Sequence, residues 1–208
     1  MIELIQVSKS YGSKQLFKDF SLKIQPKEFV TITGNSGSGK TTLLNVMGLL
    51  EKVDSGTVTI QNVKNPDWKT SQKLRRYSIG YIFQNFALLE NETVRKNLDL
   101  STKYNKNYTE EALYETLEEV GLSIDILKKK VYELSGGEQQ RIAIARTMIK
   151  PCDIIFADEP TGNLDSYNKG IIIGLLKKLN FLGKTIVCVT HDQDVAASSD
   201  RTINIPMN

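Results

Sequence analysis

The chain is poor in cysteine, histidine, tryptophan and arginine, and these shortages exclude several classes of protein. Its two cysteines, Cys152 and Cys188, have the spacing of neither a metal site nor a redox motif. Cys188 lies in the apolar run 186–189, which predicts a small buried side chain. Both thiols fit a reducing cytosol better than an oxidising compartment.

The chain also lacks an arginine-rich patch. Lysine outnumbers arginine by 21 to 6, and the formal net charge is only +3. The longest run of like charge, residues 128–130, is typical of a solvated helix end. We therefore expect no nucleic-acid partner.

A third absence concerns secretion and membranes. Residues 1–7 have no basic start and no long apolar core, so they do not resemble a signal peptide. No segment approaches the roughly 18 uninterrupted apolar residues of a membrane-spanning helix. Any role at a membrane is therefore expected to depend on a partner protein. What remains is an ordinary globular composition, 40% hydrophobic and 25% charged over 208 residues, enough for a core in one or two lobes.

The stretch 34–42 matches the phosphate-loop pattern G-x-x-x-x-G-K-[ST] at each specified position. The β-branched stretch before it, 29–33, predicts a buried strand, and 41–50 is rich in helix formers. Glycines let backbone N–H groups turn toward phosphate oxygens at the positive end of a helix. The alternative interpretation of this stretch is a plain glycine-rich turn that binds nothing. Lys40 could reach the β and γ phosphates, and Thr41 could bind Mg²⁺. The predicted nucleotide-binding residues here are Gly34, Asn35, Ser36, Gly37, Ser38, Gly39, Lys40, Thr41 and Thr42.

Apolar and alternating stretches predict further elements on both sides of this loop. The predicted strands are 2–7, 20–24, 56–60, 78–83 and 201–205, and a helix is predicted at 167–182. Tyr11 lies on a loop and could stack on a purine, with ordinary packing as the alternative. Residues 62–70 are expected to form a loop in which Trp68 packs against the protein. Gln84 follows a strand, the position of a ligand in α/β nucleotide sites.

Residues of about 85–150 predict a small helical lobe inserted into the sheet lobe. Thr93 is placed to cap a helix at 94–100, and Thr109 is placed to cap a helix at 110–120.

A second glycine-containing helix start follows at Ser135. Ser135 and Glu138 match the capping box, which predicts a helix that ends before Pro151. A cap explains this pair but leaves Gly136 and Gly137 unexplained, since glycines in a first turn destabilise a helix. Glycines are sensible where backbone approaches a ligand closely, so we predict a second anion-binding helix start.

The apolar run that begins at Asp153 ends in two carboxylates, Asp158 and Glu159. Continuous hydrophobicity predicts a parallel strand covered on both faces, and such strands present their carboxyl ends to ligand. Asp158 could hold Mg²⁺ through water and Glu159 could act on the attacking water, with solvated acids as the alternative. The strand 184–190 runs into His191, the one histidine, which could donate to the γ-phosphate or be structural.

In their order along the chain, these elements resemble the ATP-binding subunit of an ABC transporter, and the resemblance covers essentially the whole chain. It implies an α/β fold, namely a P-loop NTPase of ABC type. Its mainly parallel core sheet carries an N-terminal antiparallel β subdomain and an inserted helical subdomain. The single ATPase domain, 1–208, would divide into a RecA-like core at 1–84 and 151–208 and a helical subdomain at about 85–150.

The resemblance also implies residue roles. Tyr11 matches the adenine-stacking aromatic, Gln84 the Q-loop, residues 134–138 the LSGGE-type signature, and residues 163–165 the D-loop. The implied catalytic residues are Lys40, Gln84, Glu159 and His191, and the implied metal ligands are Thr41, Gln84 and Asp158. Tyr11, Ser135, Gly136, Gly137, Glu138 and Asp165 join the phosphate-loop residues in the implied nucleotide-binding set.

The implied cofactors are ATP and Mg²⁺, and the implied partners are a second copy of the chain and a membrane permease. Two copies would sandwich two ATP molecules, each between one Walker A loop and the other copy's signature. The permease would dock on the helical subdomain near residues 84–90, at the cytoplasmic face of the cell membrane.

Residues 158–165, with 79–84 and 88–89, resemble the group of macrolide exporters, lipoprotein-releasing ATPases and antimicrobial-peptide or bacteriocin exporters. The leading hypothesis is an ATPase subunit that powers export of a peptide, bacteriocin or drug through a separate permease. Three alternatives remain: a cell-division-type or lipoprotein-releasing ATPase that works a membrane partner mechanically, an importer ATPase, and a soluble ABC ATPase of DNA repair or translation. The last lacks support, since the chain has neither heptads nor a second Walker A motif.

Overall fold

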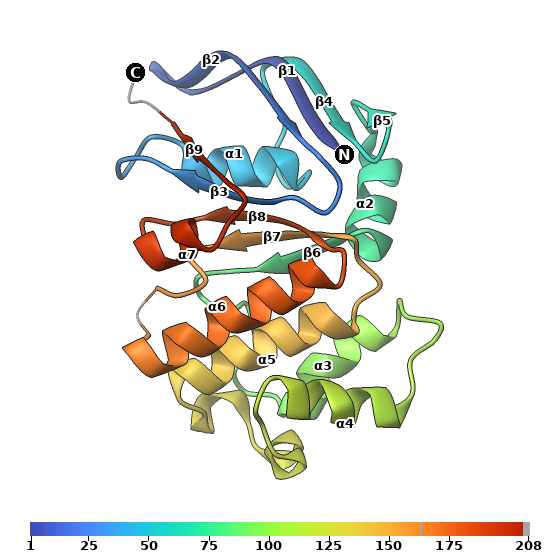
Figure 1. Ribbon diagram of the computed structural model, residues 1–208. Coiled ribbons are helices and arrows are strands. Elements are labelled where there is room, and N and C mark those ends of the chain that lie inside the picture. The colour runs from blue at the N-terminus through green and yellow to red at the C-terminus, as the bar shows by residue number, and fades with distance from the viewer. Residues whose placement is uncertain (163, 206–208) are drawn as a thin grey trace.

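The computed structural model describes residues 1–162 and 164–205, whose strands form two sheets (Figure 1). The four-stranded sheet is antiparallel, in the order β2-β1-β4-β5. Its strands are β1 (Ile2–Tyr11), β2 (Lys14–Ile24), β4 (Ser55–Ile60) and β5 (Val63–Lys64). This confirms the antiparallel β structure expected near the N-terminus.

The five-stranded sheet has the order β6-β7-β8-β3-β9, and each neighbouring pair of strands runs parallel. Its strands are β3 (Phe29–Thr33), β6 (Ile79–Ile82), β7 (Ile154–Asp158), β8 (Thr185–Val189) and β9 (Arg201–Asn204). The α/β fold with a parallel core sheet is therefore confirmed.

The inner strands are mainly apolar, as expected where each face of a parallel sheet is covered. Side chains of a strand point alternately to opposite faces. In β7, Ile155 and Ala157 belong to one buried cluster, while Ile154 and Phe156 belong to the other. Cys188 of β8 is fully buried, as the apolar run predicts.

Helices lie on both faces of the parallel sheet (Figure 1). Helix α1 lies between the two sheets, α6 and α5 lie on the other side, and α3 and α4 lie beyond α5. The α-helices are α1 (Lys40–Met47), α2 (Trp68–Tyr77), α3 (Val94–Thr102), α4 (Glu110–Glu119), α5 (Gly136–Ile149), α6 (Ser166–Phe181) and α7 (Gln193–Ala197). Two short 3-10 helices, η1 (Ile124–Lys128) and η2 (Val131–Glu133), precede α5.

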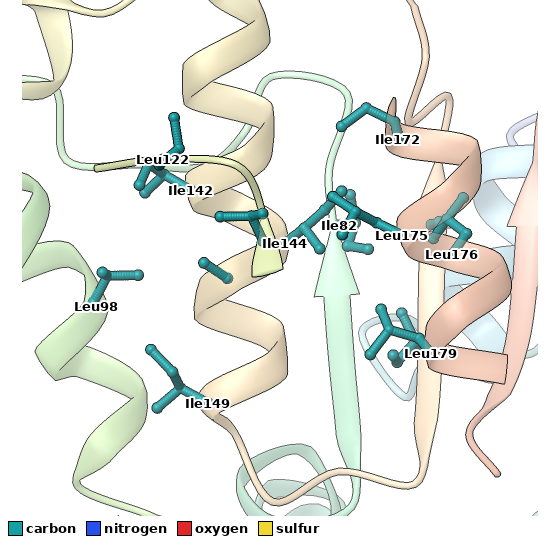
Figure 2. Packing of buried hydrophobic residues seen from close by; sticks show 14 of the residues in the cluster. Ile82, Leu98, Leu122, Ile142, Ile144, Ile149, Ile172, Leu175, Leu176 and Leu179 are labelled. Carbon is teal, nitrogen blue, oxygen red and sulfur yellow. The ribbon is translucent and has the colours of Figure 1, made fainter. Parts of the chain in front are cut away.

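Helix α5 is the centre of the larger cluster (Figure 2). Ile142 and Ile144 of α5 lie between Leu98 of α3 on one side and Ile82 of β6 and Leu175 of α6 on the other. The cluster contains residues of both predicted lobes, and the subdomain boundaries near 85 and 150 stay a prediction.

The predicted helix caps are present. The side-chain oxygens of Thr93, Thr109 and Ser135 accept hydrogen bonds from backbone N–H groups at the starts of α3, α4 and α5. The capping box of Ser135 and Glu138 is complete in both directions. These helices could be placed from sequence because a cap is a local interaction within four residues.

The prediction of a loop at 62–70 is wrong on both sides of residues 65–67, because Val63–Lys64 form the short strand β5 and a helix begins at Trp68. Asp67 caps α2 by accepting from the Thr70 backbone N–H at 2.8 Å, so a helix begins at Trp68. The packing expected for Trp68 is also wrong, because this side chain is 67% exposed and lies under the Arg75 guanidinium. Arg75 lies two turns further along α2, a helix that the sequence did not predict.

Candidate active site

Four chain segments come together at the carboxyl end of the parallel sheet. The phosphate loop follows β3, Gln84 follows β6, Asp158 ends β7 with Glu159 directly after it, and His191 follows β8. A cavity of about 690 Å³ opens there. It is lined by Tyr11, Lys14, Leu16, Gly34, Ser36, Gly37, Gly39, Lys40, Thr41, Thr42, Gln84, Glu159, Val189 and His191.

The glycines of the phosphate loop have conformations that other residues avoid. The φ angles of Gly37 and Gly39 are +77° and +89°, in the left-handed region. A Cβ at Gly34 would lie 2.8 Å from the Ile205 carbonyl oxygen and 2.9 Å from Ser38 Oγ. Gly34 has a φ of +152°, which side chains also rarely adopt. Backbone conformation therefore favours glycine at all three positions, and at Gly34 close packing excludes a Cβ as well.

The start of α1 fits a phosphate. Within the described residues, α1 begins without a side-chain cap and without an acidic residue in its first turn, whereas Thr93, Thr109 and Ser135 cap other helices. Its first N–H groups are left without intrahelical partners, and the helix dipole favours an anion there. The Lys40 ammonium donates to the carbonyl oxygens of Gly34 and Asn35 at 2.8 and 2.9 Å, which holds its charge over the loop.

Thr41 and Asp158 form a pair of oxygen donors beside the loop. The Thr41 hydroxyl donates to Asp158 Oδ1 at 3.2 Å, although the two residues are far apart in the sequence. Burial raises the pKa of the Asp158 carboxyl, which means that its charge is incompletely compensated by protein groups. Mg²⁺ prefers such oxygens and takes only one or two protein carboxylates, so the pair fits this ion. No group of three or more His, Cys, Asp or Glu side chains suited to a metal occurs in the described parts of the chain.

Glu159 is held at both carboxylate oxygens. The Thr190 hydroxyl donates to Oε2 at 2.8 Å, and His191 Nδ1 lies 3.0 Å from Oε1. Glu159 has a left-handed φ of +44°, which is uncommon for a residue with a side chain. The bend places its carboxylate at the cavity rather than along the strand.

Tyr11 and Gln84 also line the cavity. Tyr11 is the last residue of β1 and not part of a loop, and its hydroxyl donates to Glu51. This hydrogen bond raises the pKa of the Tyr11 hydroxyl. Tyr11 is 52% exposed, and the Lys9 ammonium lies over its ring, 5.2 Å from the centroid.

The sequence reading missed Lys14, Leu16 and Val189, which line the same cavity. A Cβ at Gly37 would lie 3.6 Å from Lys14 Nζ, so this ammonium reaches the phosphate loop from β2. No motif marks Lys14, because its place depends on how the antiparallel sheet folds over the loop.

The signature residues lie apart from this cavity. Among the residues the structure describes, Ser135, Gly136, Gly137, Glu138 and Asp165 are absent from its lining. Ser135 and Glu138 bind each other at the start of α5, and their hydrogen bonds lower the pKa of the Glu138 carboxyl. Asp165 caps α6 by accepting from the Asn168 N–H at 2.8 Å. Asn163, the first residue of the predicted D-loop, lies outside the described residues.

A phosphate loop after an inner parallel strand, with acidic and polar residues at neighbouring strand ends, defines the class of phosphate-loop nucleotide-binding proteins. A protein-family model described as "ABC transporter" matches residues 17–162, more than half of the chain. The chain therefore belongs to the ABC transporter family, and it is an ATP-binding ATPase of a transporter.

Curated relatives match over nearly the full chain. The chain is 42% identical over 215 residues to YvrO of Bacillus subtilis (strain 168), an uncharacterized ABC transporter ATP-binding protein, covering 99% of this chain and 93% of YvrO. It is 42% identical over 210 residues to MacB of Campylobacter jejuni, a macrolide export ATP-binding/permease protein, covering 99% of this chain and 33% of MacB. The chain thus spans about a third of the MacB proteins that it matches.

Solved structures agree with the fold. The dimeric structure of a post-hydrolysis state of the ATP-binding cassette MJ0796, bound to ADP and Pi, matches with a TM-score of 0.90 and 39% identity, covering 99% of this chain and 94% of that one. A dimeric structure of MJ0796, described as a bacterial ABC transporter cassette, matches with the same TM-score and 40% identity. In the described part of this chain, each helix is too short or too polar to cross a membrane.

Proposed function

We propose that this chain is the subunit that binds and hydrolyses ATP to power a separate membrane permease, which exports a peptide, bacteriocin or drug. The similarity to MacB, a macrolide export protein, supports export. The similarity to YvrO, of which the chain covers 93%, supports an ATP-binding subunit that is separate from its permease.

The cavity takes one ATP molecule. Tyr11 stacks on the adenine, and the N–H groups from Gly34 to Thr42 bind the phosphates. Lys40 exchanges its two carbonyl contacts for the β and γ phosphates, which are stronger partners because they are charged. Thr41, Asp158 and Gln84 would hold Mg²⁺, which supplies charge neutralisation on the phosphates.

Glu159 is the general base in this mechanism. It orients a water and accepts its proton as the water oxygen bonds to the γ-phosphorus and the bond to the bridging oxygen of ADP breaks. Thr190 is fully buried and holds one carboxylate oxygen in place. His191, with its side chain 80% exposed, can turn to donate to the γ-phosphate.

A second copy of the chain completes the site. Because Ser135, Gly136, Gly137, Glu138 and Asp165 lie away from the cavity of their own chain, they act on the nucleotide of the other copy. The start of α5 brings backbone N–H groups to the γ-phosphate across the interface. The dimeric MJ0796 structures support a dimer of this chain.

The permease docks near residues 84–90 and holds the chain at the cytoplasmic face of the membrane. Arg146 of α5 donates to the carbonyl oxygens of Phe86 and Ala87, whose φ angles are +60° and +48°. This contact supports the docking proposal, since a displacement of the 84–90 segment by the permease would be passed directly to the signature helix.

One observation carries the proposal: Glu159 lies at the edge of the phosphate-loop cavity, with both oxygens held by Thr190 and His191. Glu159→Gln should reduce phosphate release by at least about a hundredfold, because an amide accepts no proton from water. Binding of ATP should persist, and ATP with Mg²⁺ should convert the variant from monomer to dimer in light scattering.

Glu118→Gln on the exposed surface of α4 is the matched control and should hydrolyse ATP at the normal rate. Hydrolysis by Glu159→Gln near the normal rate would show that another group is the base. An ATP-bound variant that stays monomeric would count against the sandwich.

Export is tested separately, on the complex with its permease. The chain should copurify with the product of a neighbouring permease gene, and candidate peptides or macrolides should stimulate ATP hydrolysis by the complex. Copurification with a division-type membrane protein, without stimulation by any cargo, would instead favour the mechanical alternative.

A further inference from the structure

The second glycine of the α5 start is covered by a side chain of its own chain. A Cβ at Gly137 would lie 2.5 Å from Cγ and 2.9 Å from Nδ2 of Asn168, closer than packed side chains come. At Gly136, the nearest described neighbour is the Phe86 ring, 3.9 Å away. Glycine is therefore suited to the two positions for different reasons. At Gly136 it leaves the surface of the first turn open, whereas at Gly137 it makes room for Asn168.

Asn168 uses both ends of its amide to join two helices. Arg141 Nη1 of α5 donates to Asn168 Oδ1 at 2.7 Å, and Asn168 Nδ2 donates to Asp165 Oδ2 at 2.8 Å. Arginine can only donate and an ionised aspartate can only accept, so these partners determine which way the amide faces. Asn168 is a specific connector between a cation and an anion.

Asp165 is thereby held twice. Its Oδ1 accepts from the backbone N–H of Asn168 and its Oδ2 accepts from the Asn168 side chain, both at 2.8 Å. These hydrogen bonds lower the pKa of the Asp165 carboxyl. On α5, Asn168 accepts from Nη1 of Arg141, while the buried Nε of this guanidinium has no partner among the described groups.

We propose that Asn168 is a positioning residue that fixes the start of α5 to Asp165, so that the two segments move as one unit. The inference rests on the proposed ATP sandwich, in which both segments act on the nucleotide of the other copy. Asn168 touches no nucleotide in this proposal. It sets the spacing between two segments that must meet the opposite surface together.

The test uses the full chain with Glu159→Gln, which traps the ATP-bound dimer, and adds Asn168→Ala. The dimer dissociation constant in ATP and Mg²⁺ should rise about tenfold or more, within the usual range of coupling between sites. Binding of a fluorescent ATP analogue to the monomer should be unchanged, since the phosphate loop is untouched. Amide hydrogen exchange at residues 136–140 should become faster.

Asn180→Ala is the matched control, because Asn180 lies at the other end of α6 and also binds through its amide. Its Nδ2 donates to the carbonyl oxygens of Lys27 and Lys184 at 2.8 and 3.1 Å. Asn180→Ala should lower the melting temperature about as much as Asn168→Ala does. It should nevertheless leave the dimer dissociation constant and amide exchange at residues 136–140 unchanged.

Three outcomes would overturn the inference. Equal dimerisation of the Asn168→Ala and parent proteins would show that Asn168 sets no spacing, while the sandwich itself would stand. Unchanged exchange at residues 136–140 would show that Asn168 does not hold the α5 start. A parent protein that stays monomeric with ATP would remove the sandwich and this role with it.

Discussion

The two groups that hold Glu159 differ in exposure. Thr190 is fully buried, and its hydroxyl also accepts from the Asp192 N–H at 3.0 Å, so it is a fixed support. The His191 side chain is 80% exposed and can exchange its partner. The direction of the Glu159 carboxylate therefore depends more on Thr190 than on His191.

Thr190→Val should lower the turnover number for ATP about tenfold, because it removes the hydrogen bond that orients the charged base, Glu159. The affinity for ATP should change little. The measurement is steady-state phosphate release, with ATP binding followed separately.

Thr185→Val is the control at the other end of β8. The Thr185 hydroxyl accepts from the Lys27 N–H at 2.8 Å, so this change also removes a threonine hydroxyl and its hydrogen bond, but far from the cavity. A turnover number reduced equally by both changes would mean that strand stability, and not the orientation of Glu159, is responsible.

At the scale of elements, the helix glycines have very different surroundings. Gly48 ends α1, and a Cβ there would lie 2.7 Å from Cε1 and 2.8 Å from Cζ of Tyr81. The Tyr81 ring is stacked on Phe83, and its hydroxyl donates to the Gly48 carbonyl oxygen, so this side chain cannot move aside easily. Gly174, within α6, has no heavy atom within 4 Å of its Cβ position among the described residues.

The two glycines should therefore respond oppositely to alanine. Gly48→Ala should reduce the free energy of unfolding by about 1–3 kcal/mol through overpacking. Gly174→Ala should increase it by about 0.5–1 kcal/mol, because alanine loses less backbone entropy in a helix. Urea unfolding of both variants measures the difference, and a destabilised Gly174→Ala protein would contradict the structure of α6.

For the whole molecule, the larger buried cluster connects the helical part to the parallel sheet. Leu98 of α3 lies in the same cluster as Ile82 of β6 and Leu176 of α6 (Figure 2). Leu117 of α4 belongs to this cluster too. Since residues on both sides share one packed interior, the two parts should unfold together.

Leu98→Ala should lower the free energy of unfolding by about 2–5 kcal/mol, because it leaves a cavity in the joint core. Unfolding should remain a single transition by circular dichroism and by Trp68 fluorescence. Leu100→Ala on the same helix, where the side chain is 41% exposed, should change stability by less than about 1 kcal/mol. Two separate transitions would instead mean that the helical part unfolds on its own.

The sequence by itself determined the features that depend on a few neighbouring residues. The pattern of 34–42 predicted the phosphate loop, and Thr93, Thr109 and Ser135 predicted helix starts that the structure confirms. These signals work because a tight turn or a cap is formed within one turn of chain. The order of the motifs was enough to identify the family, since it does not depend on coordinates.

Only the tertiary structure decided which of these residues meet. It separates Ser135–Glu138 from the cavity that contains Lys40 and Glu159, and it packs the Asn168 side chain against Gly137. It also brings Lys14 to the phosphate loop. Each of these relations concerns residues far apart in the chain. The distance between such residues depends on sheet order and helix packing, which no local pattern encodes.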